Sequence, residues 1–392
     1  MKSEWNTSAI ANICKVVTDG SHTSPKSVSH GKYMVSVKDF TPYGFDFNGC
    51  RQISFADYEK LKSSGCVPQK GDILIGKDGA RYFEDIIIYN QDEAPALLSS
   101  IAILRCDEEK VIPEYLYYLL KTPSFKKDVK DNYGSGSAIP RIILKDFKRM
   151  KVEYPSIEKQ RQIVSILHDL DAKIFNNQKV NDNLEQQAAA LFSSLYNRSN
   201  TEVRYTDLIQ ILGGGTPKTG ETAYWNGNIA FFTPKDVGTP YTFITEKTIT
   251  EEGLSHCNSR LYPVNTVFVT ARGTVGKVGL SGVPMAMNQS CYALVGKETH
   301  QLLVYFYTLK AVDRLKHKAS GAVFDAITTR DFDSEQIMKL SDDDAKAFLC
   351  VAEPMFQEIL NNSIENLRLS TLRAFLLPKL LSGEIDVSSV QL

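Results

Sequence analysis

The sequence lacks the features that would direct a chain into or across a membrane. Its first residues include no apolar signal core, and no run of about 18 apolar residues occurs anywhere. Its seven cysteines lie far apart, form no C-x-x-C pair and are odd in number, which suits neither a disulfide framework nor a zinc ribbon. We therefore expect a cytoplasmic protein, not associated with a membrane, whose cysteines are reduced and structural.

The sequence also lacks an excess of basic residues. It has 45 Lys and Arg against 46 Asp and Glu, so composition alone does not indicate nucleic-acid binding. Only a local surface has to be positive for DNA binding, however. The hydrophobic content of 43% and charged content of 23% are those of a globular protein and exclude a disordered or fibrous chain. A length of 392 residues predicts two or three compact units, of which two is our expectation.

Motifs of catalysis are missing as well. No Asn/Asp-Pro-Pro-aromatic motif of an adenine methyltransferase occurs, residues 213–217 lack the G-x-G-x-x-G spacing, and residues 271–278 form an incomplete phosphate loop. The six histidines show no metal-ligand spacing. Asp92, Glu108 and Lys110 have the residue types of a metal-dependent nuclease, but acidic residues in such a loop are usually only solvated. We therefore nominate no catalytic residue and no metal ligand.

An internal duplication organises the chain. Residues 136–147 align without gaps on residues 321–332, and the same offset then holds for roughly sixty residues. Upstream the match is looser, although residues 71–79 resemble 265–273 and 37–39 resemble 234–236. Each half therefore reads as a globular domain followed by a helix, and the two halves agree best in their helices.

The two globular parts, about residues 12–153 and 204–339, are rich in short β-like runs broken by Gly, Pro, Asn and Ser. Each part is also predicted to hold a pair of helices near its end. The predicted helices are 113–120 and 123–129 in the first part, and 301–309 and 312–318 in the second. The pattern predicts an α+β fold with β-rich globular parts and short helices.

After each globular part, seam positions recur with alternating spacings of four and three, which is the heptad pattern of a coiled coil. The first seam follows Ser156, a predicted N-cap, and comprises Ile163, Leu167, Leu170, Ile174, Asn177, Asn181, Leu184, Ala188, Leu191 and Leu195. The second follows Ser341 and comprises Phe348, Ala352, Met355, Ile359, Asn362, Asn366, Leu369, Arg373, Leu376 and Leu380.

Both seams carry two asparagines at their middle. Such polar residues cost stability but fix register and partner. If the helices run antiparallel about a pseudo-two-fold axis, Asn177 meets Asn366 and Asn181 meets Asn362. The alternative is two separate amphipathic helices, each packed on its own domain. We further expect Pro354 to restart the second helix and Pro378 to bend its last turn, which would leave a continuous part of roughly 27 rather than 40 residues.

The repeated variable domains and similar helices, with residues 155–164 opening the first helix and 376–385 closing the second, resemble Type I restriction–modification specificity subunits. The resemblance implies target recognition domains at 1–153 and 199–339, an antiparallel coiled-coil pair of spacer helices at 154–198 and 340–392, and a non-catalytic role. It also implies double-stranded DNA with a bipartite target as ligand, two modification (methyltransferase) subunits as partners and, where present, restriction subunits. The methyl donor, ATP and Mg²⁺ would belong to those partners. Residues 341–346 are less like the usual opening of the family's helix.

Base reading needs donors and acceptors on loops held by a rigid scaffold, with Arg or Lys suited to guanine and Asn or Gln to adenine. The candidates at corresponding places are Lys38, Asp39, Lys77, Asp78, Arg81 and Arg141 in the first domain, and Lys235, Asp236, Arg272, Thr274, Lys277 and Ser320 in the second. Each competes with the simpler interpretation of a solvated surface residue. Aromatic residues such as Tyr82 and Trp225 are set aside because they more often pack in cores or loops.

Three other interpretations stay open. A duplicated coiled-coil adaptor that docks only proteins would show no affinity for duplex DNA, whereas a specificity subunit would bind it selectively and with salt dependence. A self-sufficient nuclease is disfavoured by the missing motifs. The specificity subunit of a related fused restriction–modification enzyme would have the same sequence features.

Overall fold

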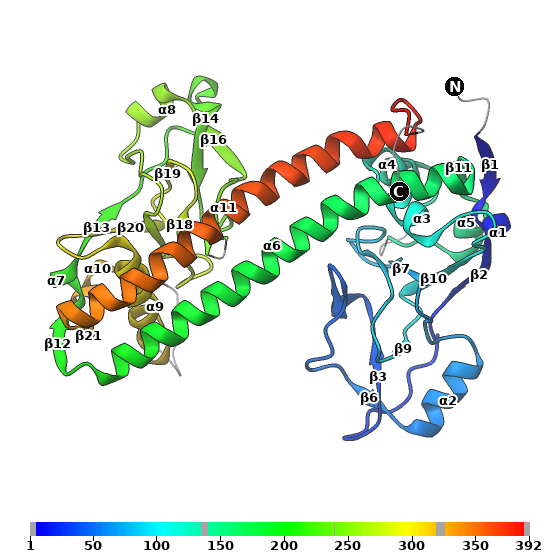
Figure 1. Ribbon diagram of the computed structural model, residues 1–392, viewed down its shortest axis with the longest axis horizontal. Helices are drawn as coiled ribbons and strands as arrows, with labels where there is room; N and C mark the ends of the chain where they lie inside the picture. Colours follow the sequence, from blue (N-terminus) through cyan, green and yellow to red (C-terminus); the bar gives the residue numbers. More distant parts are fainter. Residues whose placement is uncertain (1–4, 135–139, 239, 319–325, 388–392) are drawn as a thin grey trace. The chain divides into compact units, whose positions relative to one another are not determined.

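The computed structural model describes residues 5–134, 140–238, 240–318 and 326–387, and it confirms the predicted α+β fold class (Figure 1). The chain forms two compact units, here called the first unit (residues 1–172 and 369–392) and the second unit (residues 173–368). Each unit combines a globular part with one segment of helix α6 (Ile157–Arg198) and one segment of helix α11 (Asp342–Leu381). The domain ranges proposed from the sequence stay predictions.

A four-stranded antiparallel sheet forms the centre of the first unit. Its strand order is β2 (Cys14–Asp19), β10 (Ile101–Cys106), β7 (Ile73–Gly76) and β8 (Ile86–Ile88). Successive side chains of a strand face opposite sides of its sheet. Ile73 and Ile75 accordingly join one buried cluster, and Leu74 joins another. Both faces of the sheet are covered, which is why β7 is a continuous apolar run instead of an alternating one.

Smaller elements complete the first unit. They are β1 (Asn6–Ala9), α1 (Ile10–Ile13), β3 (Lys32–Val35), η1 (Val37–Asp39), β4 (Phe40–Thr41), β5 (Gly44–Phe45), β6 (Gln52–Ile53), α2 (Phe55–Ser63), β9 (Ala96–Leu97), α3 (Pro113–Leu120), α4 (Pro123–Asn132), α5 (Leu144–Arg149) and β11 (Lys151–Tyr154). Strands β1 and β11 pair antiparallel, so the start of the chain is hydrogen-bonded to the strand that precedes α6.

The second unit is built around a five-stranded sheet. Its strand order is β13 (Ile209–Gly213), β20 (Cys291–Gly296), β17 (Val267–Thr270), β18 (Val278–Ser281) and β15 (Tyr241–Thr242). Val267 and Val269 of β17 join one buried cluster and Phe268 joins another, as the residues of β7 do in the first unit. The remaining elements are β12 (Thr201–Arg204), α7 (Tyr205–Leu208), η2 (Thr222–Tyr224), β14 (Trp225–Phe232), β16 (Lys247–Ile249), α8 (Glu251–Ser255), β19 (Met285–Met287), α9 (Gln301–Lys318), α10 (Thr329–Ser334) and β21 (Gln336–Lys339).

Strand pairing shows which positions of the two units are equivalent. Strand β10 pairs with β7 through Ile101 and Gly76, and β20 pairs with β17 through Cys291 and Thr270. Strands β12 and β21 pair antiparallel, as β1 and β11 do in the first unit. The internal duplication seen in the sequence therefore extends to the backbone of the globular parts.

The short helices that precede the long helix differ between the two halves of the chain. Helices α3 and α4 are separate, because Pro123 begins α4 and the Thr122 hydroxyl accepts a hydrogen bond from Phe125 N at 3.3 Å. The predicted break between residues 309 and 312 is wrong, since α9 runs without interruption through this region. Lys310 and Ala311 provide neither a proline nor a cap, Ala is the strongest helix former, and Ala311 is buried in the core.

The expectation that Pro354 restarts the second long helix is also wrong. Helix α11 is continuous over 40 residues, through both Pro354 and Pro378. Pro354 has no N–H to donate to the carbonyl of Cys350, but both residues are exposed, so water can satisfy that carbonyl. Buried Ala352 and Phe356 hold the opposite face of the same turns in the core. Tertiary packing thus outweighs the cost of the proline.

The long helices start at the predicted caps. Helix α11 begins directly after Ser341, whose hydroxyl accepts a hydrogen bond from Asp344 N at 3.1 Å. Helix α6 begins directly after Ser156. Over the described part of the chain, no helix is both long and apolar enough to cross a membrane.

Candidate nucleic-acid interface

In each unit, a short turn presents one lysine and turns one aspartate inward. Asp39 accepts hydrogen bonds from Ser36 N at 2.8 Å and from Ser36 Oγ at 3.1 Å. Asp236 accepts the same pair of bonds from Thr233, at 2.7 and 2.6 Å. Lys38 and Lys235 are exposed on these turns. Both aspartates therefore fix the shape of a turn, and the lysines are the side chains that can reach a ligand.

A second turn follows the central strand of each sheet. Lys77 N donates to Ser100 O at 2.9 Å, and Ala271 N donates to Ser290 O at 2.8 Å, so Lys77 and Ala271 are equivalent. Two residues later the backbone adopts positive φ at Gly79 (93°) and at Gly273 (81°), which glycine allows without strain. The residues between, Asp78 and Arg272, therefore occupy the same place on the same corner.

A third segment joins this corner in both units. Asp78 forms a β-bridge with Arg141, and Arg272 forms one with Ala326. Beside these bridges, Ile142 N donates to Lys77 O at 3.0 Å, and Ile327 N donates to Ala271 O at 2.9 Å. Ser320, a further candidate, lies outside the described residues.

The lysine turn lies next to the corner in both units. In the second unit, the hydroxyl of Thr274 donates to Pro234 O at 2.9 Å. In the first unit, a Cβ built on Gly76 would lie 3.4 Å from a methyl group of Val37. The structure thus brings most of the proposed residues of each domain to one end of its central sheet.

The exposed candidates differ in their partners. Arg81 hydrogen-bonds Asp85 at 2.8 Å, and this bond raises the pKa of the guanidinium above its ordinary value. Lys235 lies 3.7 Å from a carboxylate oxygen of Glu246. Arg141, Arg272 and Lys277 are also exposed. Because exposed ion pairs contribute little free energy, Arg81 and Lys235 can exchange their partners for a phosphate or a base.

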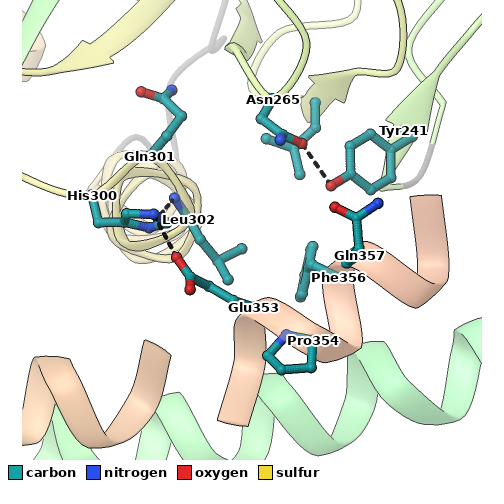
Figure 2. A pocket seen from close by; sticks show the side chains of 10 residues that line it. Tyr241, Asn265, His300, Gln301, Leu302, Glu353, Pro354, Phe356 and Gln357 are labelled. Atoms are coloured by element: carbon teal, nitrogen blue, oxygen red, sulfur yellow. Dashed lines mark hydrogen bonds and ion pairs between the residues drawn. The ribbon is translucent and has the colours of Figure 1, made fainter. Parts of the chain in front are cut away.

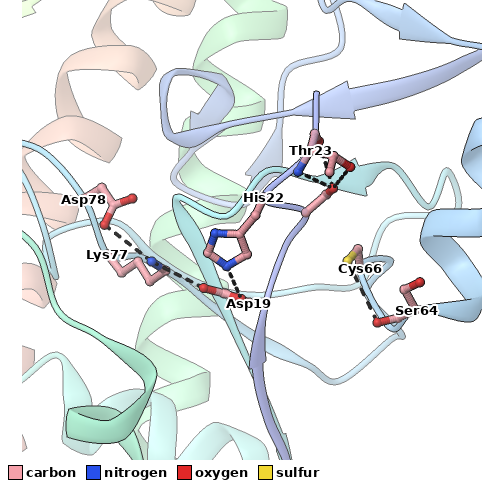
Figure 3. Close-up of polar contacts among 8 residues, drawn as sticks. Asp19, His22, Thr23, Ser64, Cys66, Lys77 and Asp78 are labelled. Carbon is pink, nitrogen blue, oxygen red and sulfur yellow. Dashed lines mark hydrogen bonds and ion pairs between the residues drawn. The ribbon is translucent and has the colours of Figure 1, made fainter. Parts of the chain in front are cut away.

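Lys77 is the exception, because its side chain is buried with an exposed fraction of 7%. Its ammonium lies 3.4 Å from Asp19 Oδ2 and 3.5 Å from Asp78 Oδ1 (Figure 3). Asp19 also contacts His22 Nε2 at 3.3 Å. Lysines are almost never this buried unless they are paired. Lys77 therefore offers DNA little surface, and its role has to be sought in what it holds.

The nuclease-like set from the sequence has other partners in the structure. Asp92 is almost fully exposed and pairs with Lys70 at 2.7 Å, whereas Lys110 pairs with Asp107 at 3.1 Å. Across the residues that the structure describes, no group of three or more His, Cys, Asp or Glu could hold a metal ion.

The four seam asparagines lie in the second unit, where the segments of α6 and α11 pair antiparallel. Asn177 Nδ2 donates to Asn366 Oδ1 at 2.9 Å, and Asn362 Nδ2 donates to Asn181 Oδ1 at 3.0 Å. Asn177 also donates to Glu365 at 2.7 Å, which contributes to lowering the pKa of that carboxyl. These are the pairs expected for antiparallel helices. Their role in fixing the register stays a prediction.

A cavity of about 400 Å³ in the second unit was not anticipated from the sequence (Figure 2). Across it, Tyr241 donates to Asn265 at 2.8 Å, and His300 contacts Glu353 at 2.6 Å. His300 also accepts a hydrogen bond from Leu302 N through Nδ1 at 3.3 Å. The contact of His300 with Glu353 joins the residue before α9 to α11, and the bond of Tyr241 joins β15 to the residue two positions before β17.

The two duplicated sheets thus present exposed polar side chains on equivalent turns. A family model for the Type I restriction modification DNA specificity domain matches residues 2–186 and 197–339. The chain therefore belongs to the family of Type I restriction–modification DNA specificity subunits, which recognise a DNA sequence and are not themselves catalytic.

Individual relatives agree with this family. The chain is 24% identical over 310 residues to the Type I restriction enzyme MjaIX specificity subunit of Methanocaldococcus jannaschii, covering 72% of this chain and 71% of that one. It is also 24% identical to the HindI specificity subunit of Haemophilus influenzae, covering 81% and 87% of the two chains. The crystal structure of the S subunit from M. genitalium superimposes with a TM-score of 0.61 at 15% identity, covering 96% of both chains. That likeness shows the same fold.

Proposed function

We propose that the chain reads a bipartite target in double-stranded DNA, each unit reading one half-site. The observation that carries this proposal is the duplicated corner, in which backbone bonds at Lys77 and Ala271 are the same but the neighbouring side chains differ. Two equivalent scaffolds with different polar side chains are suited to reading two different short sequences. Lys38 and Lys235 lie at equivalent exposed places, where they can contact the phosphates beside each half-site.

The long helices would set the distance between the half-sites. Helix α6 has 42 residues and α11 has 40. At about 1.5 Å per residue, helices of this length span roughly 60 Å, which is an outer limit for the separation of the half-site centres. With about 34 Å per duplex turn, this limit corresponds to roughly 1.8 turns, and within it we expect the centres to lie roughly one to one and a half turns apart. The spacer is then fixed in length but free in sequence.

The family also suggests what binds this chain. We propose that it docks two modification (methyltransferase) subunits and, where they are present, restriction subunits. The methyl donor, ATP and Mg²⁺ would be bound by those partners, and the purified chain alone would neither methylate nor cleave DNA. Transfer of a labelled methyl group by the isolated chain would refute this division of labour.

Methylation mapping tests the two-half-site proposal. Cells carrying the chain and its modification partner should show one bipartite methylated motif. Exchanging residues 12–153 for the corresponding part of another such subunit should change one half-site, and exchanging residues 204–339 should change the other. A continuous motif, or an exchange that changes both half-sites, would contradict the proposal.

Shortening both helices tests the spacing. Residues 174–180 and 363–369 form one heptad in each helix around Asn177 and Asn366, and removing both keeps the seam pattern. One heptad corresponds to about 10 Å of rise and changes the helix rotation by only about 20°. The expected spacer is roughly three base pairs shorter, at about 3.4 Å per base pair. Removing only residues 174–180 is the control, because it puts the two helices out of step and should abolish modification. An unchanged spacer in the shortened protein would contradict the role of the helices.

A further inference from the structure

The corner beside the central strand carries opposite chemistry in the two units. Asp19 and Gly213 are equivalent, because they pair with the equivalent residues Ala102 and Tyr292. Ser21 and Gly215 are also equivalent, because Ser21 N donates to Leu97 O and Gly215 N donates to Met287 O. Three more equivalent pairs follow these residues or the ends of β7 and β17 along the chain. They are His22 with Thr216, Lys77 with Ala271, and Asp78 with Arg272.

In the first unit these residues form a chain of contacts in which buried Asp19 and Lys77 lie between exposed His22 and partly exposed Asp78. His22 contacts Asp19, Asp19 contacts Lys77, and Lys77 contacts Asp78 (Figure 3). The side chains of Asp19 and Lys77 are 8% and 7% exposed, whereas Asp78 is 30% exposed. The outer carboxylate is thus held from behind by a buried ammonium.

The fold does not need this buried pair. The second unit builds the same corner, with the same backbone hydrogen bonds, from Gly213 and Ala271. Taking two charges out of water is costly, and such a pair often contributes no net stability. What the pair does in the first unit is restrict the position of Asp78, because the ammonium of Lys77 lies against its carboxylate. A restrained acceptor discriminates between bases better than a freely rotating one.

We propose that Asp78, positioned by Lys77, selects cytosine in the half-site read by the first unit, and that Arg272 selects guanine in the half-site read by the second. A carboxylate only accepts hydrogen bonds, and in the major groove the N4 amino group of cytosine is its matching donor. A guanidinium only donates, and O6 and N7 of guanine are its matching acceptors. This inference rests on the proposed function, in which each unit reads one half-site.

The variant Asp78→Asn tests the selection of cytosine. It keeps the size of the side chain but adds two donors, and an amide matches N6 and N7 of adenine. In cells with the modification partner, preference for cytosine at one position of one half-site should fall by roughly 10- to 100-fold, with adenine gained there. The other half-site should not change. Asp78→Arg, which copies the second unit, should instead favour guanine at the same position.

Asp92→Asn is the matched control. Asp92 is an exposed carboxylate of the same unit, but it pairs with Lys70 beyond the other end of β7 and β8, away from the turn that holds Asp78. This variant should leave both half-sites unchanged. Arg272→Ala should lower preference for guanine at one position of the second unit's half-site and leave the first unit's half-site intact.

Lys77 is tested as a positioning residue by the neutral pair Asp19→Asn with Lys77→Gln. We expect the same position to lose its preference for cytosine while the thermal unfolding midpoint and the other half-site stay as in the parent. If the neutral pair retains the full preference, Lys77 does not position Asp78. If the parent shows a bipartite motif but Asp78→Asn leaves it unchanged, the inference is overturned and the proposed function stands. A parent that modifies no bipartite motif overturns both.

Discussion

Replacing the seam asparagines on both helices should stabilise the protein by more than the two one-sided replacements together predict, because a one-sided replacement leaves a buried amide without its partner. In the variant Asn177→Leu with Asn181→Leu, Asn362 loses its acceptor and Asn366 loses its donor. Asn366 keeps a bond to Ile174 O at 3.3 Å, but Asn362 is only 8% exposed, so its amide is largely cut off from solvent that could replace its partner. An unsatisfied buried amide costs about 1–3 kcal/mol, which offsets much of the gain from burying two leucines.

Leucine at all four positions removes the orphaned amide. The quadruple variant should therefore be more stable than the sum of the two one-sided double variants predicts, with a coupling free energy of about 1–3 kcal/mol. Urea unfolding of the full chain, followed by helical circular dichroism, measures this cycle. If the free-energy changes of the two double variants add up to that of the quadruple variant within about 0.5 kcal/mol, the reasoning is refuted. The quadruple variant should also lose register, since uniform leucine seams tolerate slippage, and methylation mapping should show weaker or less uniform spacing.

Two further predictions each concern a carboxylate that contacts two cationic side chains. Hydrogen bonds from Lys126 and Lys130 lower the pKa of Glu84 to about 2, so the stability they contribute is present above the carboxyl's ordinary pKa near 4.5 and is lost as pH falls toward 2. Glu84→Gln should flatten the decline of the unfolding midpoint between about pH 5 and pH 2, and an unchanged pH profile would contradict this. Glu335 is fully buried and contacts Arg314 and Lys318, so Arg314→Met with Lys318→Met should cost about 3–5 kcal/mol in urea unfolding, and adding Glu335→Gln should restore part of it. Equal stability with and without Glu335→Gln would show that no charge had been left buried.

The sequence was most informative where periodicity and local chemistry coincide. The seam placed Asn177 opposite Asn366 because a heptad repeat allows few antiparallel registers once two polar positions must meet. The N-caps at Ser156 and Ser341 could also be predicted from the sequence, because a hydroxyl directly before an acidic first turn is typical of a helix start.

The sequence misled where tertiary packing decides the outcome. Pro354 is a strong local signal for a helix start, yet Ala352 and Phe356 bury enough surface to carry α11 through it. Lys77 is a DNA-reading candidate from the sequence, and such a residue is expected to be exposed on a loop. Only its neighbour Asp19, far away in the sequence, shows that its ammonium is buried. A partner that lies on another strand cannot be predicted from the residues next to Lys77 in the sequence.

The proposed recognition residues were harder to predict than the scaffold that carries them. The corner is held by backbone hydrogen bonds at Lys77 and Ala271, and a backbone bond does not depend on the side chain that follows it. A lysine and an alanine can therefore occupy equivalent positions, and an aspartate and an arginine can follow them, without changing the fold. Constraints on folding shape the strands and the glycine turns, whereas constraints on recognition act on side chains that the fold leaves free. A sequence comparison between the halves finds the residues that shape the fold by their similarity. It has to look for recognition residues where the halves differ, as at Asp78 and Arg272, for which we propose that role.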